Sequence, residues 1–265
     1  MDLGSPIGMI VATAAVLTGV ILLGGDLGNI LDLPSFILVM FPTIAALCIA
    51  FPFKQVLNVR RHVKIILGRQ TFDPLHYVNI MSELAEKARS QGLLALENEA
   101  GNIEDSFVKG AALMVADAVE PETVEERLQA SMDALAVRHA QSWAVYDRGA
   151  AFAPAFGMMA TVVALVNMLL NLDFADAGGV ASLGVNMSAA LITTLYGSFI
   201  ANVFFLPLGA KLRVRHQNEI DCKKIVVVGI LAIQRGINPR VVKEMLLERL
   251  DPKYADMEAS ARGGE

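Results

Sequence analysis

Three threonine hydroxyls inside otherwise apolar segments are the side chains of this sequence best suited to chemistry. Thr161 lies in an uncharged run that follows Arg148, and Thr193 and Thr194 lie in a second uncharged run that follows Asp176. A hydroxyl oxygen is a hard ligand, which suits a cation that must shed water. The same hydroxyl can instead bond to the carbonyl one helical turn before it and need no ligand. The residues alone leave both an ion path and simple helix packing open.

Helical spacing groups these threonines with other small or conformationally special residues. Pro154, Met158 and Leu165 share one side of a helix with Thr161. The second run forms a ribbon of two adjacent columns: Ala189, Thr193, Gly197 and Ala201, and then Ala190, Thr194, Ser198 and Asn202. Small residues at this spacing let membrane helices approach closely, so packing is the competing interpretation of the ribbon. Pro154 and Pro207 each remove a backbone hydrogen bond and can kink their helices, with or without a mechanistic role.

No Asp, Glu, Lys, Arg or His lies in the central part of either run. Proton and cation relays inside a membrane normally need an ionisable group, which is costly to bury. If this protein moves ions, we therefore expect the carboxylate to come from a partner helix. The four histidines, His62, His76, His139 and His216, are scattered without metal-ligand spacing. No nucleophile–base pair or glycine-rich phosphate loop is present, so we expect neither an enzyme nor a fixed metal or cofactor.

The elements that must position these residues are membrane helices. The chain is 54% hydrophobic and only 18% charged, whereas a soluble domain carries about 25% charged residues. Four uncharged intervals, each of about 20 residues or more, are long enough to cross the hydrocarbon core of a bilayer. They lie between Asp2 and Asp26, Asp32 and Lys54, Arg148 and Asp173, and Asp176 and Lys211. The sequence predicts an all-α integral membrane protein with four transmembrane helices.

The distribution of cations predicts the orientation. All 22 Lys and Arg residues lie in two segments, Lys54–Arg148 and Lys211–Arg262. By the positive-inside rule these segments are cytosolic, and both termini are too. The predicted organisation is spans one and two in 1–53, a cytosolic helical domain in 54–148, spans three and four in 149–208 and a cytosolic tail in 209–265. The net charge of −5, with bases and acids mixed, predicts no nucleic-acid partner. Both cysteines, Cys48 and Cys222, face a reducing side, so no disulfide is expected.

Start signals divide the cytosolic domain into helices. A helix is predicted over Leu75–Gln91 with Asp73 as its N-cap, a second from Asp105 or Ser106 to Val119, and a longer one from Pro121 into the third span.

Four stretches resemble, in order and spacing, the flagellar motor stator A subunits of the MotA/PomA family. PAFGMMATVVAL, Pro154–Leu165, is similar to their third span, and ALITTLYGSFIANVFFLP, Ala190–Pro207, to their fourth. ARSQGLLALE, Ala88–Glu97, is similar to their cytosolic torque region, and ILAIQRGINPR, Ile230–Arg240, to their tail. The likeness covers nearly the whole chain and is nearest the PomA branch.

The resemblance implies a ring of five such subunits around the single spans of two B subunits of the MotB/PomB type, in the bacterial inner membrane. The B subunit supplies a membrane aspartate that carries the ion. The resemblance implies that the ion path and B-subunit lining contain Pro154, Met158, Thr161, Thr193, Thr194, Tyr196, Gly197 and Pro207. A hydroxyl at Thr161 resembles sodium-type members, where proton-type members have alanine. We therefore expect Na⁺ rather than H⁺ as the coupling ion, bound transiently near Thr161.

Arg89 and Glu97 match the charged pair that engages the rotor protein FliG in this family, and Lys87 and Glu99 are candidates to share that role. Without the resemblance, these residues read as a solvated helix face with local ion pairs. The sequence departs from the PomA pattern at five further positions: Ser90 replaces a base, Asn98 and Ala151 replace acids, and Ala160 and Ala164 replace glycines. Asp147, one turn before Ala151, is a candidate stand-in for the lost acid.

Two other functions remain open. A subunit of the ExbB/TolQ type would also surround a borrowed aspartate to energise outer-membrane transport, but those proteins have three spans. A non-energising membrane scaffold would use the small-residue ribbon purely for packing.

Overall fold

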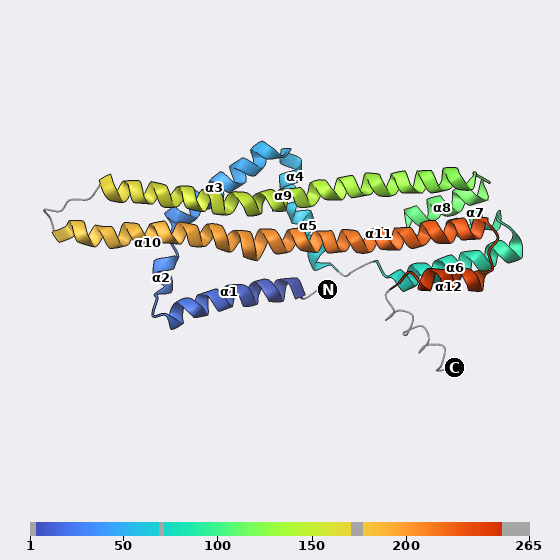
Figure 1. Ribbon diagram of the computed structural model, residues 1–265, viewed down its shortest axis with the longest axis horizontal. Coiled ribbons are helices and arrows are strands. Elements are labelled where there is room, and N and C mark those ends of the chain that lie inside the picture. Colours follow the sequence, from blue (N-terminus) through green and yellow to red (C-terminus); the bar gives the residue numbers. More distant parts are fainter. Residues whose placement is uncertain (1–3, 69–71, 171–176, 251–265) are drawn as a thin grey trace. The chain divides into compact units, whose positions relative to one another are not determined.

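The computed structural model describes residues 4–68, 72–170 and 177–250, and all its regular structure is helical (Figure 1). The described residues form two compact units. The first combines those of Met1–Arg69 and Ala140–Val214, and the second those of Gln70–His139 and Arg215–Glu265. Two long helices, α9 (Pro121–Leu170) and α11 (Leu206–Gln234), contribute residues to both units. Most of the segment between the predicted third and fourth spans and the last part of the predicted tail lie outside the described residues.

Four helical segments are long and apolar enough to cross a membrane, which confirms the four predicted spans. They are Gly4–Leu22, Leu33–Ala50, the apolar part of Pro121–Leu170 and the apolar part of Asn186–Gln234. The first of them buries none of its residues inside the chain. A helix satisfies all its own backbone hydrogen bonds, so such a segment can face hydrocarbon directly.

The first unit also contains short helices that join the spans. Its elements are α1 (Gly4–Leu22), α2 (Leu27–Ile30), α3 (Leu33–Ala50), α4 (Phe53–Leu57), α5 (Val59–Leu67), the end of α9, α10 (Ala177–Phe199), the π-helix η1 (Ile200–Phe205) and the start of α11. The Asp32 side chain caps α3 by accepting the Ser35 N–H at 2.9 Å. One stripe of α3 is buried: Ser35, Val39, Thr43 and Leu47. Its small polar members let α3 pack closely against α10.

The π-helix η1 ends at Phe205, two residues before Pro207. Pro207 has no N–H, so the usual bond from this position to the carbonyl of Val203 cannot form. At Leu206 the backbone N–H reaches back to the carbonyl of Ala201, five residues earlier, instead of four. The predicted disturbance at Pro207 thus takes the form of a wide turn, a feature that is frequent at functional sites.

The second unit is a bundle of shorter helices. It contains α6 (Pro74–Gln91), α7 (Ala95–Ala100), α8 (Ser106–Ala116), the start of α9, the end of α11 and α12 (Pro239–Leu247). Asp73 is confirmed as the N-cap of α6, because its carboxylate accepts the Leu75 N–H. The predicted start of the next helix at Asp105 or Ser106 is also confirmed: α8 begins at Ser106, and Asp105 caps it by accepting the Phe107 N–H. The predicted end of α8 at Val119 is wrong by three residues. The helix ends at Ala116, and Ala118 has a φ of 54° that no helix continues through.

Apolar side chains from all these helices form the core of the second unit. Its most deeply buried members include Val78, Met81, Leu96, Val108, Val115, Val124, Val226, Ile230, Val242 and Leu246. Cys222 is buried in the same core, and burial raises the pKa of its thiol to about 12. The thiol is therefore protonated and unreactive at neutral pH.

Candidate functional site

The predicted threonines meet where α9 and α10 lie side by side. The Thr161 hydroxyl oxygen is 3.1 Å from that of Thr193 and 2.6 Å from that of Thr194. It is also 3.0 Å from the carbonyl oxygen of Gly157 and 2.9 Å from that of Ala190. The hydroxyls of these three threonines, from here the threonine cluster, and the two carbonyls place five oxygen atoms close together in the contact between α9 and α10, from here the seam.

Each threonine hydroxyl has one proton to donate, which limits the hydrogen bonds within the threonine cluster. Thr193 donates to the carbonyl of Ala190 at 2.7 Å, and carbonyls can only accept. The Thr161 hydroxyl has one proton, so it either donates to a neighbouring carbonyl and accepts from Thr194, or donates to Thr194. Thr193 is 1% exposed, whereas Thr194 is exposed. The Thr194 hydroxyl is therefore the exposed member of the threonine cluster that a cation or a protonated group of another chain can reach.

Two glycines allow this close approach. A Cβ on Gly157 would lie 3.0 Å from the carbonyl oxygen of Thr193, and a Cβ on Gly197 would lie 2.6 Å from that of Ala153. Ala153, Ala160, Ala190 and Ala201 complete the buried seam. The first column of the ribbon, from Thr193 to Ala201, is thus buried packing, whereas Thr194, Ser198 and Asn202 in the second column are exposed.

The remaining predicted lining residues do not all join the threonine cluster. Pro154 lies at the seam, since its Cα would be 3.1 Å from a Cβ on Gly197. Met158 is 60% exposed and lies away from the buried contacts. Pro207 lies beyond η1, where it lines a groove of about 500 Å³ together with α1 residues such as Gly8 and Met9.

Tyr196, which was predicted to line the same ion path, contacts the segment before α3 instead. Its hydroxyl donates to the carbonyl of Ile30 and accepts the N–H of Asp32 at 3.1 Å. Its ring packs edge-on against Phe36 with centroids 5.9 Å apart. Tyr196 therefore fastens α10 to the segment that precedes α3.

At the other end of the third span, Asp147 forms an ion pair with Arg213. The Arg213 guanidinium also lies 5.9 Å from the centre of the Trp143 ring. Beside them, Tyr146 is buried against Ile66 and Leu212. Asp147, the candidate stand-in for the acid missing at Ala151, is thus engaged within its own chain.

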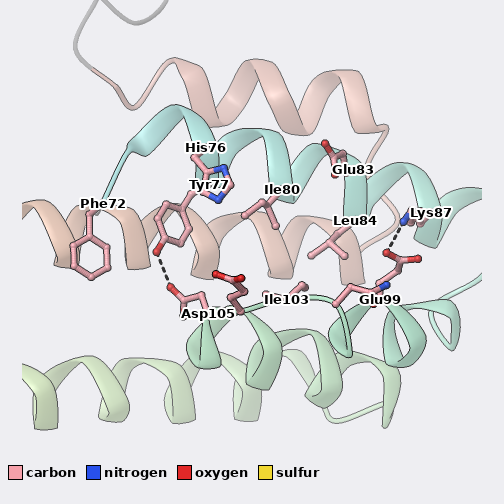
Figure 2. Close-up of a pocket in the computed structure, with 12 residues that line it drawn as sticks. Phe72, His76, Tyr77, Ile80, Glu83, Leu84, Lys87, Glu99, Ile103 and Asp105 are labelled. Carbon is pink, nitrogen blue, oxygen red and sulfur yellow. Dashed lines mark hydrogen bonds and ion pairs between the residues drawn. The ribbon is translucent and has the colours of Figure 1, made fainter. Parts of the chain in front are cut away.

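The four predicted rotor-facing residues divide into two pairs. Lys87 on α6 forms an ion pair with Glu99 on α7, with side chains 42% and 27% exposed (Figure 2). Arg89 and Glu97 are exposed, and within the described residues neither makes an ion pair. Of these four residues, Arg89 and Glu97 therefore carry the charges that are not paired within the described part of the chain.

A cavity of about 630 Å³ lies between α6 and the segment that joins α7 to α8 (Figure 2). The Lys87–Glu99 ion pair lies at one end, and at the other the Tyr77 hydroxyl donates to Asp105 at 2.6 Å. Burial alone would raise the pKa of Asp105, but the hydrogen bonds from Tyr77 and two backbone N–H groups, with the Lys223 ammonium, hold it below its ordinary value. Asp105 is therefore a structural carboxylate that stays ionised at neutral pH.

Sequence reasoning missed a contact between two histidines. The Nδ1 atoms of His139 and His216 lie 3.1 Å apart although the residues are 77 positions apart in the chain. No motif connects them. Only the register of α9 against α11 brings them together, and the spacing along the chain does not reveal it.

Comparisons with known proteins match this chain over nearly its full length. Residues 99–224 match the family described as the MotA/TolQ/ExbB proton channel family, and residues 6–92 match the motility protein A N-terminal family. The chain is 34% identical to motility protein A of Borreliella burgdorferi, over 100% of both chains. It is 32% identical to chemotaxis protein PomA of Vibrio alginolyticus, over 95% of this chain and 96% of PomA. These identities do not single out the PomA branch.

The fold matches a solved stator structure as well. The flagellar MotAB stator complex from Bacillus subtilis contains a chain with a TM-score of 0.89 and 28% identity, covering 97% of this chain and 100% of that chain.

Proposed function

The chain belongs to the MotA/PomA family of flagellar motor stator A subunits, and we propose that it assembles with a B subunit into an ion channel that drives flagellar rotation. The observation that carries the proposal is the threonine cluster. It is a polar half-site in membrane helices that have no ionisable residue at their centres. Ion transfer at that point needs a carboxylate, and a B subunit of the MotB/PomB type supplies one.

The proposed assembly is a ring of five of these chains around two B helices in the bacterial inner membrane, with both termini in the cytosol. The exposed face of Thr194 and the neighbouring seam lie toward the B aspartate. Ion binding at that aspartate changes its contacts with the threonine cluster and Pro154. The resulting movement of the ring shifts Arg89 and Glu97 against the rotor. No enzymatic step is part of this function.

We propose Na⁺ as the coupling ion. Hard cations take oxygen ligands, and the threonine cluster gathers hydroxyl and carbonyl oxygens within 3.1 Å of the Thr161 oxygen. A proton needs no such set of ligands. The chain's identity to PomA is compatible with either ion, so the choice rests on the oxygen cluster.

The decisive experiment is motility of a stator-deleted host that carries this chain with its B subunit. Swimming should fall as Na⁺ is lowered at fixed pH, and Thr161→Ala should raise the Na⁺ concentration that is needed. Thr13→Ala is the matched control, because the Thr13 hydroxyl bonds to the carbonyl of Met9 in its own helix, at 2.8 Å, and to no other helix among the described residues. Swimming that is unchanged without Na⁺, together with a silent Thr161→Ala, would contradict sodium coupling. Immobility despite membrane assembly would contradict the stator function itself.

We propose that Arg89 and Glu97 contact FliG, because they are the unpaired members of the predicted set. Charge matching across an interface sets encounter rate and orientation more than affinity. Arg89→Glu should therefore lower swimming without lowering the amount of assembled complex. Lys109→Glu, an exposed charge on α8, is the control. Equal effects of Arg89→Glu and Lys109→Glu on swimming would contradict a specific contact of Arg89 with FliG.

The ExbB/TolQ function remains the second candidate, since the family that matches residues 99–224 includes those proteins. The four membrane-spanning helices favour the stator. Recovery of a partner of the ExbD type in a pull-down, instead of a peptidoglycan-binding B subunit, would support the transport function. Ion flux that continues after the B aspartate is removed would contradict both the stator and the ExbB/TolQ function.

A further inference from the structure

His139 and His216 form an interhelical pair within the second unit. Their Nδ1 atoms are 3.1 Å apart, and their rings lie at 82° to each other with centroids 5.1 Å apart. Both side chains are partly exposed. The pair connects α9 to α11, and neither histidine takes part in the proposed ion path or rotor contact.

This separation suits metal coordination. Two imidazole nitrogens that bind one ion at about 2.0–2.1 Å, with an angle near 95–110° between the bonds, lie about 3.0–3.4 Å apart. The observed 3.1 Å falls in that range. A metal ion bound by both atoms lies beside the line that joins them, so each ring turns its Nδ1 lone pair away from that line when the ion replaces the shared proton.

The surroundings of the pair favour the neutral imidazoles that a metal needs. Burial lowers the pKa of both His139 and His216, and Arg138 and Lys223 lower that of His139 further. The Glu219 carboxylate acts in the opposite direction on both rings, which shows that a negative charge lies near them. Its pairing with Lys223 at 3.6 Å is long and leaves that carboxylate available to balance a cation nearby.

We propose that His139 and His216 are the two protein ligands of a site for a divalent ion of the Zn²⁺ and Cu²⁺ class, which clamps α9 to α11. No third His, Cys, Asp or Glu completes a metal cluster in the described part of the chain, so water occupies the remaining coordination positions. The site therefore exchanges its ion and does not hold it permanently. Nitrogen ligands exclude Mg²⁺ and Ca²⁺, which prefer oxygen.

The test is calorimetric titration of the purified complex of the full-length chain and its B subunit, with Zn²⁺ and, separately, with Mg²⁺. We expect one Zn²⁺ site per chain, at least about tenfold weaker in His139→Gln and in His216→Gln. His76→Gln is the matched control, because His76 is an exposed histidine of the same unit. Binding should be unchanged in that variant, and Mg²⁺ should not bind.

A second measurement separates loss of a ligand from loss of folding. Zn²⁺ should raise the thermal unfolding temperature of the wild-type complex and of His76→Gln, but not that of either pair variant. Cu²⁺ should bind more tightly than Zn²⁺, as nitrogen sites generally do. Zn²⁺ affinity that is the same in wild type and in both pair variants would overturn the proposal. So would a Zn²⁺-induced thermal shift that survives in either pair variant.

Discussion

Substitution of Gly197 by alanine tests the seam that holds the threonine cluster. The added Cβ would lie 2.6 Å from the carbonyl oxygen of Ala153 and 3.1 Å from the Cα of Pro154. Both atoms belong to the backbone of a helix, so neither can turn away as a side chain would. Ordinary contact begins at 3.4 Å, so α9 and α10 must separate by several tenths of an ångström.

Overpacking of this kind costs about 1–3 kcal/mol of stability. The same separation weakens the hydrogen bond between the Thr161 and Thr194 hydroxyls, which lies about one helical turn away. Gly197→Ala should therefore lower both the thermal unfolding temperature of the complex and swimming in the stator-deleted host. At about 2–4 °C per kcal/mol for a chain of this size, the thermal shift is measurable.

Gly184→Ala is the matched control on the same helix. No atom lies within 4 Å of the position that its Cβ would take. Alanine is the better helix former by up to about 1 kcal/mol, so this variant should be neutral or slightly more stable. Equal unfolding temperatures and equal swimming for Gly184→Ala and Gly197→Ala would refute the claim that the α9–α10 contact depends on a glycine.

Three further predictions concern contacts outside the seam. Tyr196→Phe leaves the carbonyl and N–H groups before α3 without their partner, at a cost of about 1–3 kcal/mol. Amide exchange should accelerate around residue 32, and unchanged exchange there would show that the Tyr196 hydroxyl does not hold this segment. Reversing Lys87 or Glu99 alone should cost no more than about 1 kcal/mol because both are partly exposed, and exchanging the two should restore stability. A double variant as unstable as both single ones combined would argue against the pair. Because the pKa of Asp105 is lowered by folding, its stabilisation is present above its ordinary pKa of 3.8 and is lost as the pH falls through the lower folded value. Tyr77→Phe should reduce that acid dependence in thermal unfolding by circular dichroism, and an unchanged pH profile would exclude the Tyr77 hydroxyl as its cause.

Local signals in the sequence were sufficient for most of the fold. Uncharged intervals depend only on the order of residues, so the four spans were predictable. Asp73 and Asp105 cap helices that begin one residue later, which is also local information. The threonine cluster was partly predictable, since i+4 columns place Thr193 and Gly197 on the same face of α10.

Contacts that depend on tertiary register were not predictable. The outward column containing Thr194 could not be told from the inward column until α9 was placed against α10. Tyr196 shares helical spacing with the seam residues, yet it bonds to a segment 164 positions away. Lys87 and Glu99 looked like equivalents of Arg89 and Glu97, because a sequence does not show that α7 folds back on α6.

The π-helix before Pro207 also has a consequence for comparing relatives of this chain. A π turn amounts to one residue inserted into an α-helix, and it rotates everything after it by about 100° relative to an uninterrupted helix. Leu212 and Arg213, which face Tyr146 and Asp147, owe their direction to that rotation. A relative that lacks one residue between positions 200 and 205 can therefore present the same faces from a plain α-helix. An alignment gap in this segment would mark a change of helical phase and leave the membrane span intact.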